Sequence, residues 1–123
     1  MSVGSQVAAF AREVARHNTV WVLQFEDDSL LMWEDSDGTV TIPLWSSEKR
    51  ATRSLKLVEE DGVVGAIVIS ISLDDLISRW LPQFQQKNAA LGPNWSGAEL
   101  SGWSLSPDDV MRRISTSKDS HLT

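Results

Sequence analysis

The side chains with the clearest chemical potential are carboxylates gathered in one stretch of the chain. Residues 24–39 hold six acidic residues and no Lys or Arg, and four of the six are Asp27, Asp28, Asp35 and Asp37. Carboxylates can bind a metal ion, exchange a proton in acid–base catalysis, or attract a basic partner. Each of these uses requires a different spacing of the side chains.

A metal site is not supported by the spacing. Asp35, Asp37 and Gly38 resemble the start of a calcium-binding loop, but such a loop needs Gly at its sixth position and Glu at its twelfth. Those positions hold Val40 and Ser46. The chain has no Cys and only two His, which removes the commonest zinc sites. A solvated turn explains the acidic residues better, and we expect no metal and no cofactor.

Catalytic arrangements are equally absent from the pattern. The acidic pairs at 27–28, 74–75 and 108–109 are adjacent, so the two side chains of each pair diverge on a strand or a helix. A serine nucleophile needs a base, and neither His17 nor His121 has a recognisable context. The segment 102–106 lacks the final Gly of the G-x-S-x-G motif. We therefore predict no catalytic residue.

Six Trp residues with no Tyr are the unusual feature of the composition. Trp21, Trp33 and Trp80 lie on apolar phases of predicted elements, which favours burial. Trp45, Trp95 and Trp103 stand in turns beside Pro or Gly. Exposed Trp is enriched at binding hot spots, so Trp45 and Trp95 are candidate binding residues, although a ring folded over the edge of the core is an equal alternative.

The elements that must position these residues follow from hydrophobic periodicity and capping signals. Four helices are expected. The first covers residues 3–16, and the second runs from Ser46 or Ser47 to Leu57. The third follows Ser72 and is expected to kink or break at Pro82, and the fourth begins at Pro107. Strands are expected at 20–25, 30–33, 40–44 and 63–72, the first three as an antiparallel meander and the last buried on both faces. Short strands are also expected near 89–91 and 102–105.

This order predicts a single α+β domain over residues 1–116, with a flexible C-terminal tail at 117–123. The domain is expected to hold one antiparallel sheet of about four or five strands with helices packed on one face. Within it, Leu23, Ile67, Leu76 and Trp80 are predicted to be buried because each lies on the apolar phase of its element.

Several of these segments together resemble a known family. They are Val20-Trp21-Val22-Leu23, Asp37-Gly38, Pro43-Leu44-Trp45-Ser46, Trp80-Leu81-Pro82 and Ser106-Pro107-Asp108-Asp109. The chain resembles domain-of-unknown-function family 2750 from about residue 5 to residue 114. The resemblance implies a small bacterial α+β domain, and it implies no activity.

Charge and composition narrow the class of function further. The 123 residues carry a formal net charge of −6, which argues against a general nucleic-acid binder. No apolar run reaches membrane-spanning length, and the charged N-terminal helix does not resemble a signal peptide, so a cytoplasmic protein with no membrane partner is expected. The sequence does not indicate an oligomeric state.

Two classes of function remain open on the sequence. One is a protein-interaction module, such as an immunity or antitoxin-like protein, that meets a basic partner protein through Asp27, Asp28, Asp35 and Asp37. The other is a small-ligand binder, or an enzyme with an unrecognised site, lined by Trp45, Trp80 and Trp95. The acidic segment could also be only a solvated face that protects a sheet edge.

Overall fold

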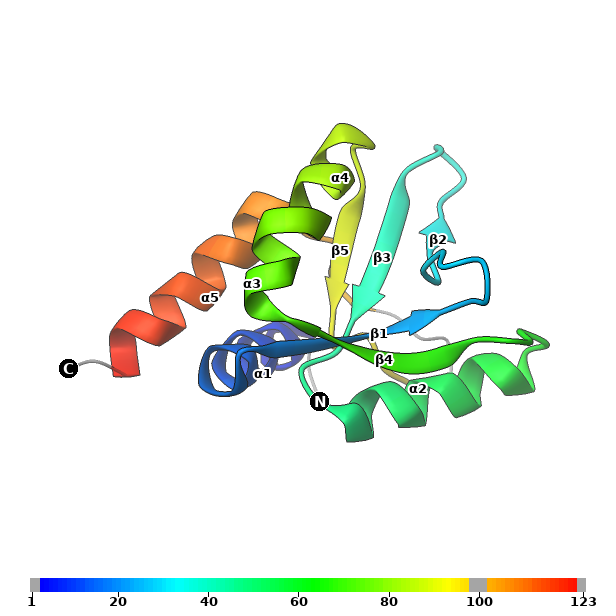
Figure 1. Ribbon diagram of the computed structural model, residues 1–123, viewed down its shortest axis with the longest axis horizontal. Helices are drawn as coiled ribbons and strands as arrows, with labels where there is room; N and C mark the ends of the chain where they lie inside the picture. Colours follow the sequence, from blue (N-terminus) through cyan, green and yellow to red (C-terminus); the bar gives the residue numbers. More distant parts are fainter. Residues whose placement is uncertain (1–2, 98–101, 122–123) are drawn as a thin grey trace.

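The computed structural model describes residues 3–97 and 102–121 (Figure 1). Its elements are α1 (Val3–His17), β1 (Thr19–Gln24), β2 (Trp33–Glu34), β3 (Val40–Leu44), α2 (Glu48–Glu60), β4 (Ile67–Ser72), α3 (Leu73–Asp75), a π-helical turn η1 (Leu76–Trp80), α4 (Leu81–Gln86), β5 (Ala90–Pro93) and α5 (Pro107–His121). The predicted α+β class is confirmed.

Local hydrogen bonds explain where the helices begin and end. Asn18 adopts a left-handed φ of 55°, and its N–H still bonds to the carbonyl of Val14, which closes α1. Each of three serines accepts, at its hydroxyl oxygen, the N–H of the residue three positions later, as N-cap residues do. These bonds are Ser47 to Arg50 at 3.2 Å, Ser72 to Asp75 at 3.1 Å and Ser106 to Asp109 at 3.1 Å.

The strands pair differently from the predicted meander. β1 pairs antiparallel with β4, with Thr19 opposite Ser72 and Gln24 opposite Ile67. β3 lies between β2, which is antiparallel to it, and β5, which is parallel to it. The expected single antiparallel sheet is therefore replaced by two small sheets, because the backbone groups of β1 are taken by a strand that follows more than forty residues later.

A single bridge joins the two sheets. Trp21 of β1 and Trp45, the residue after β3, exchange two backbone hydrogen bonds of 2.8 Å each. The carbonyl of Leu23 accepts the N–H of Leu31 at 2.8 Å, which turns the chain back beside β1. The expected strand at 30–33 is thus reduced to isolated contacts and the short β2.

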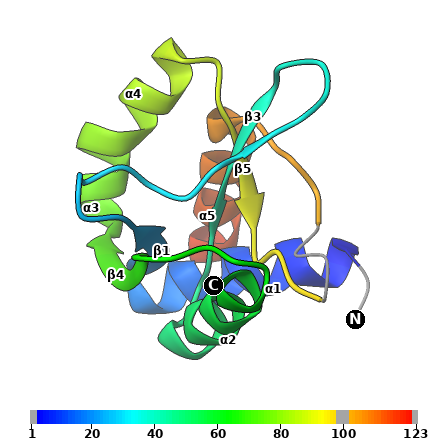
Figure 2. The same ribbon diagram turned by 90° about the vertical axis from the view of Figure 1, so that its right-hand side faces the viewer.

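The core has two parts, one on each side of β1. Val20 and Val22 pack with side chains of α1, α3, α4 and α5, whereas Leu23 packs with α2 and the two indoles of Trp45 and Trp95. Figure 2 shows the β1–β4 pair running between α3 and α4 above and α2 below. Helices therefore cover both faces of the β1–β4 sheet rather than the one face predicted, since β1 carries apolar side chains on both of its faces.

Strand β4 is shorter and more exposed than predicted. It begins at Ile67 rather than at Val63, and Ile67 is 60% exposed, although Ile71 is buried. Val64, before the strand, is 84% exposed. The prediction that this segment is buried on both faces is wrong, as is the predicted burial of Ile67, because β4 is an outer strand.

The predicted break at Pro82 takes the form of a π turn. Pro82 has no N–H for the helical bond to residue 78, and its ring would crowd that carbonyl. In η1 the N–H of Leu81 bonds instead to the carbonyl of Leu76, and the helix continues into α4. Leu76 is fully buried as predicted, whereas Trp80 is only half-buried.

The C-terminal segment differs from the expected tail. α5 continues to His121, and the Lys118 ammonium donates to Asn18 Oδ1 at 2.6 Å and to the carbonyl of Ala15 at 3.4 Å. Residues 117–121 therefore extend a helix that packs against α1. Residues 122 and 123 of the predicted tail lie outside the described residues.

The separation of the two core clusters predicts additive mutational effects. Leu23→Ala on one side and Ile114→Ala on the other should each lower the free energy of unfolding by about 2–5 kcal/mol. Because the two side chains lie in different clusters, the double variant should lose the sum to within about 0.5 kcal/mol. Urea denaturation of the four proteins measures this, and a strongly non-additive result would contradict two separate clusters.

Candidate functional site

The four predicted acidic site residues lie in two exposed turns. Asp27 and Asp28 belong to the turn after β1, and Asp35 and Asp37 to the turn between β2 and β3. All four side chains are exposed, as expected for turn residues.

Hydrogen bonds inside these turns hold two of the carboxylates in their charged form. Asp27 Oδ1 accepts the Ser29 hydroxyl at 2.5 Å and the Ser29 N–H at 3.0 Å, and these bonds lower the pKa of Asp27. The Thr39 N–H donates to Asp37 Oδ1 at 3.0 Å and likewise lowers the pKa of Asp37. Both turns therefore carry fixed negative charge at neutral pH.

An apolar groove of about 250 Å³ lies beside the first acidic turn. Its walls are mainly apolar side chains of the 28–32 segment, β3 and the η1–α4 helix. They are Leu30, Met32, Val40, Ile42, Trp80, Phe84 and Ala89, with Asp28, Ser29, Gln83 and Lys87 as the polar members. We call this the Trp80 groove. The sequence placed Trp80 either in the core or in a ligand site with Trp45 and Trp95, so it did not indicate this groove.

Two side chains keep apolar surface open in the Trp80 groove. Met32 is 45% exposed, and Trp80 is half-buried with its ring 6.1 Å from that of Phe84. The Trp80–Phe84 spacing of four residues places both rings on one helix face. That spacing was the signal in the sequence that could have indicated the groove.

Trp45 and Trp95 lie inside the protein rather than on its surface. Trp45 is 1% and Trp95 7% exposed. The Trp45 indole N–H donates to the carbonyl of Trp95 at 2.8 Å, and the Trp95 indole N–H donates to the carbonyl of Trp103 at 2.9 Å. Of the three turn residues, only Trp103 has an exposed side chain. The expectation that Trp45 and Trp95 are surface contact residues is therefore corrected.

The predicted ligand site lined by Trp45, Trp80 and Trp95 is not assembled. Trp45 and Trp95 share one core cluster, and the cavity that they line together measures only about 30 Å³. Trp80 packs against the other cluster and lines a different groove. Burial of their polar N–H groups required partners within the chain, and the two carbonyls supply them.

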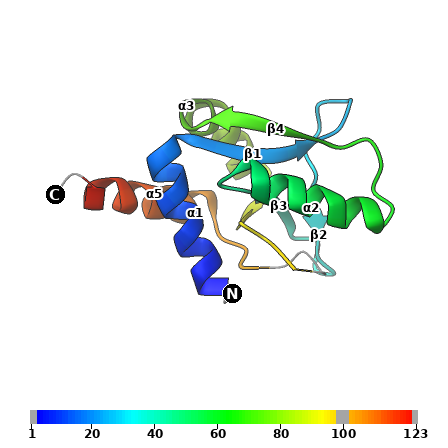
Figure 3. The same cartoon turned by 90° about the horizontal axis from the view of Figure 1, so that it is seen from below.

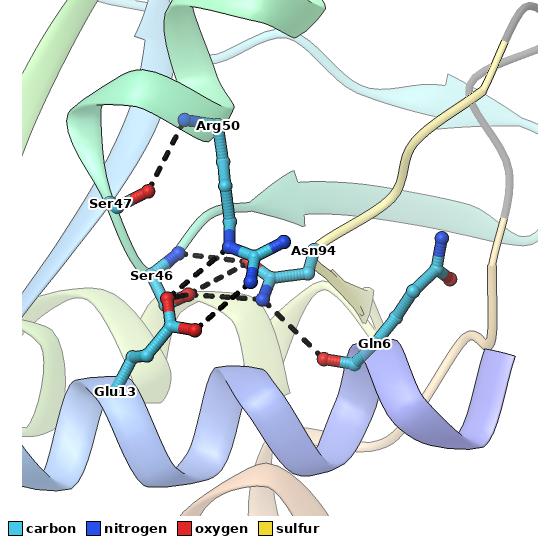
Figure 4. Close-up of polar contacts among 6 residues, drawn as sticks. All are labelled: Gln6, Glu13, Ser46, Ser47, Arg50 and Asn94. Carbon is cyan, nitrogen blue, oxygen red and sulfur yellow. Dashed lines mark hydrogen bonds and ion pairs between the residues drawn. The ribbon is translucent and has the colours of Figure 1, made fainter. Parts of the chain in front are cut away.

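A polar network lies next to Trp45, where α1, the start of α2 and the end of β5 meet (Figure 4). The Arg50 guanidinium donates to both carboxylate oxygens of Glu13, at 3.2 and 3.0 Å. The Ser46 hydroxyl donates to the same carboxylate at 2.7 Å. Glu13 thus joins α1 to the turn that begins α2.

Asn94 extends this network to the end of β5. Its Oδ1 accepts the N–H of Ser46 at 2.9 Å, and its amide donates to the Ser46 hydroxyl at 3.0 Å and to the carbonyl of Gln6 at 3.4 Å. The Gln6 amide in turn donates to the Ser96 hydroxyl. Asn94 is 1% exposed, so these partners replace the water that its side chain has lost.

The Ser46–Glu13 contact has the residue types of a nucleophile and its base but not their properties. Ser46 is 2% exposed, so a substrate cannot reach its hydroxyl. Partial burial acts to raise the pKa of Glu13, but the hydrogen bonds from Arg50 and Ser46 outweigh it and leave the pKa lowered. A carboxylate held in this way is a weak base, and the network serves to fasten three elements together.

Two further features bear on the range of functions. Within residues 3–97 and 102–121, no three His, Cys, Asp or Glu side chains form a group that could hold a metal ion. Across the same ranges, no helix has both the length and the apolar character needed to cross a lipid bilayer.

The Glu13 network predicts a pH-dependent stability. Because the folded-state pKa of Glu13 is lowered, its contribution is complete above the ordinary pKa of about 4.5 and is lost as the pH falls through the lowered value. Glu13→Gln should therefore cost about 1–2 kcal/mol at pH 7 and much less near pH 3. Urea denaturation of both proteins at each pH checks this. A difference that stays constant with pH would contradict it.

The buried indoles predict unequal effects of two Trp substitutions. Trp45→Ala removes a buried ring and a hydrogen bond and should lower the free energy of unfolding by about 3–5 kcal/mol. Trp103→Ala removes a half-exposed ring and leaves its bonded backbone carbonyl in place, so it should cost about 1 kcal/mol or less. Chemical denaturation compares the two, and equal losses would show that the burial of Trp45 is misassigned.

Comparison with known proteins agrees with the resemblance seen in the sequence. No curated protein matches the chain. One family model, described as a protein of unknown function (DUF2750), matches residues 7–114. That range contains the Trp45 bridge, the polar network apart from Gln6, the acidic turns and the Trp80 groove. The chain belongs to the DUF2750 family.

Proposed function

We propose that this domain binds a partner protein through the Trp80 groove and the acidic turns beside it. The observation that carries the proposal is an apolar groove in which Met32 is exposed and Trp80 is half-buried, with Asp28 of the first acidic turn among its lining residues. Apolar surface beside fixed charge of one sign fits a partner segment with an apolar anchor flanked by basic residues.

Charge supports a basic partner. The chain has a net charge of −6, and residues 24–39 contribute six acidic side chains and no Lys or Arg. Clustered charge of one sign accelerates the approach of an oppositely charged partner over about one Debye length, roughly 8 Å near 0.15 M salt. Lys87 is the one basic residue among those lining the groove, and it would receive an acidic or carbonyl group of the partner.

The dimensions of the groove favour a protein segment over a small molecule. Its volume of about 250 Å³ is below the roughly 300–1,000 Å³ of typical ligand pockets. A groove of this size has room for an apolar side chain or two from a partner. For this groove, the small-ligand interpretation therefore has less support than the protein-interaction one.

The concrete form of the proposal is an immunity or antitoxin-like protein of the bacterial cytoplasm that neutralises a basic toxin. Small size, acidity and the absence of a recognisable catalytic arrangement in the sequence all agree with such a role. A tight inhibitor of this kind would combine fast, charge-steered association with a slow off-rate set by apolar contacts.

The test is a selection of displayed random peptides against the wild-type domain. The enriched peptides should carry Leu, Met, Phe or Trp next to Lys or Arg. Binding of the best synthetic peptide is then measured by calorimetry and by surface-plasmon kinetics. Met32→Glu places a charge in the groove and should weaken binding at least about tenfold at any salt concentration.

A matched pair of quadruple variants separates local charge from net charge. Replacing Asp27, Asp28, Asp35 and Asp37 by Asn should slow association at low salt and leave the off-rate nearly unchanged. The control neutralises four exposed acidic residues on α2 and α5 to the same extent, namely Glu48, Glu59, Glu60 and Asp119. Equal association rates for the two variants, or peptides that bind the Met32→Glu protein normally, would refute the proposal.

A further inference from the structure

The outer edge of β4 has no strand beside it. In the described part of the chain, the two-stranded sheet consists of β1 and β4 alone, and β1 continues through Trp21 and Trp45 to the second sheet. Figure 3 shows β4 on the outside of this arrangement, with β1 between it and the second sheet. One side of β4 is therefore open to a further strand.

The register identifies which backbone groups face this open side. The backbone N–H and carbonyl of Trp21 form hydrogen bonds with Trp45, on the side away from β4. Ser70, the residue of β4 opposite Trp21, therefore forms no backbone hydrogen bond with β1. Bonded and non-bonded positions alternate along an antiparallel pair. The N–H and carbonyl groups of Val68 and Ser70 are therefore directed outward, whereas those of Ile69 and Ile71 bond to β1.

This edge lacks the usual protection against pairing. Exposed edge strands commonly carry Pro, Lys or other charged residues that discourage pairing. Residues 62–73 contain neither Pro nor a charged residue. In the described chain, three of the five exposed large hydrophobic side chains lie in or near β4, and they are Val64, Ile67 and Ile77. Apolar surface and free hydrogen-bonding groups thus occur at the same place.

We propose that β4 pairs antiparallel with β4 of a second copy of the chain. With Ile69 on the two-fold axis, Val68 of each copy lies opposite Ser70 of the other. Both are outward-facing residues, so this register forms bonded pairs at every outward position. The self-pairing is independent of the Trp80 groove, to which β4 contributes no residue.

The apolar residues of β4 favour a second copy over an unrelated strand. In this register the exposed Ile67 of one copy lies opposite Ile71 of the other, at the end where the helix carrying the exposed Ile77 begins. Ile71 is itself buried, so the apolar surface that the two copies share consists of Ile67 and of the half-buried Ile69 residues, which lie opposite each other on the axis. The strand itself is uncharged, so two chains of net charge −6 place no like charges opposite each other along β4.

A dimer held by one strand pair is small. Its interface would fall below the standard size of about 1,600 Å², so a dissociation constant of roughly micromolar order is expected. The association should therefore be visible as a change of mass with concentration.

The experiment is sedimentation of the wild-type chain from about 5 µM to about 500 µM. Ser70→Pro removes an outward N–H that β1 does not use, and should abolish dimers while the fold is kept. Ser70→Thr keeps that N–H and serves as the matched control. Ser70→Lys protects the edge by charge and is a second test should the Pro variant fail to fold. Circular dichroism verifies the fold of each variant.

Amide hydrogen exchange locates the contact. In the wild type, the amides of Val68 and Ser70 should become at least about tenfold slower at high concentration, whereas those of Ile69 and Ile71 are slow throughout. A chain that stays monomeric at the highest concentration overturns the proposal. So does a dimer that persists in the Ser70→Pro and Ser70→Lys variants, or protection of Val68 and Ser70 that appears only with a different protein. Met32→Glu should dimerise as the wild type does, which separates this result from the groove.

Discussion

The structure depends on the way Trp45 joins the two sheets. Its backbone pairs with Trp21, and its indole N–H reaches the carbonyl of Trp95, so one residue connects β1, the end of β3 and the segment after β5. The next residue, Ser46, continues the connection through Asn94 and Glu13 to α1. A two-stranded sheet is marginally stable on its own, and this junction lets it share a core with the three-stranded sheet.

Signals that act over a few residues were read correctly from the sequence. The helix starts predicted near Ser47, after Ser72 and at Pro107 depend on one capping side chain and the adjacent backbone, so neighbouring residues suffice to predict them. Strand pairing is different, because β1 had two candidates of similar quality. The nearby segment at 30–33 is favoured by chain proximity, but β4 offers a complete six-residue ladder.

The same distinction explains the candidate site. The exposure of Asp27 and Asp37 follows from turn chemistry and was predicted, whereas the burial of Trp45 depends on a carbonyl fifty residues away. Beside Pro and Gly, a Trp looks like a surface residue until its distant partner is known. The Trp80 groove was missed for a related reason, because its other walls come from β3 and the segment before β2.

The packing of α1 against α5 has a consequence for how the chain acquires its structure. Asn18 and Lys118 are 100 residues apart in sequence, and Phe10 and Val14 share a core cluster with Val110 and Ile114. While the chain is being synthesised, the apolar face of α1 must remain without its partner until α5 has left the ribosome. Such long-range closure slows folding, so the domain should complete its core only after nearly all of it has been made.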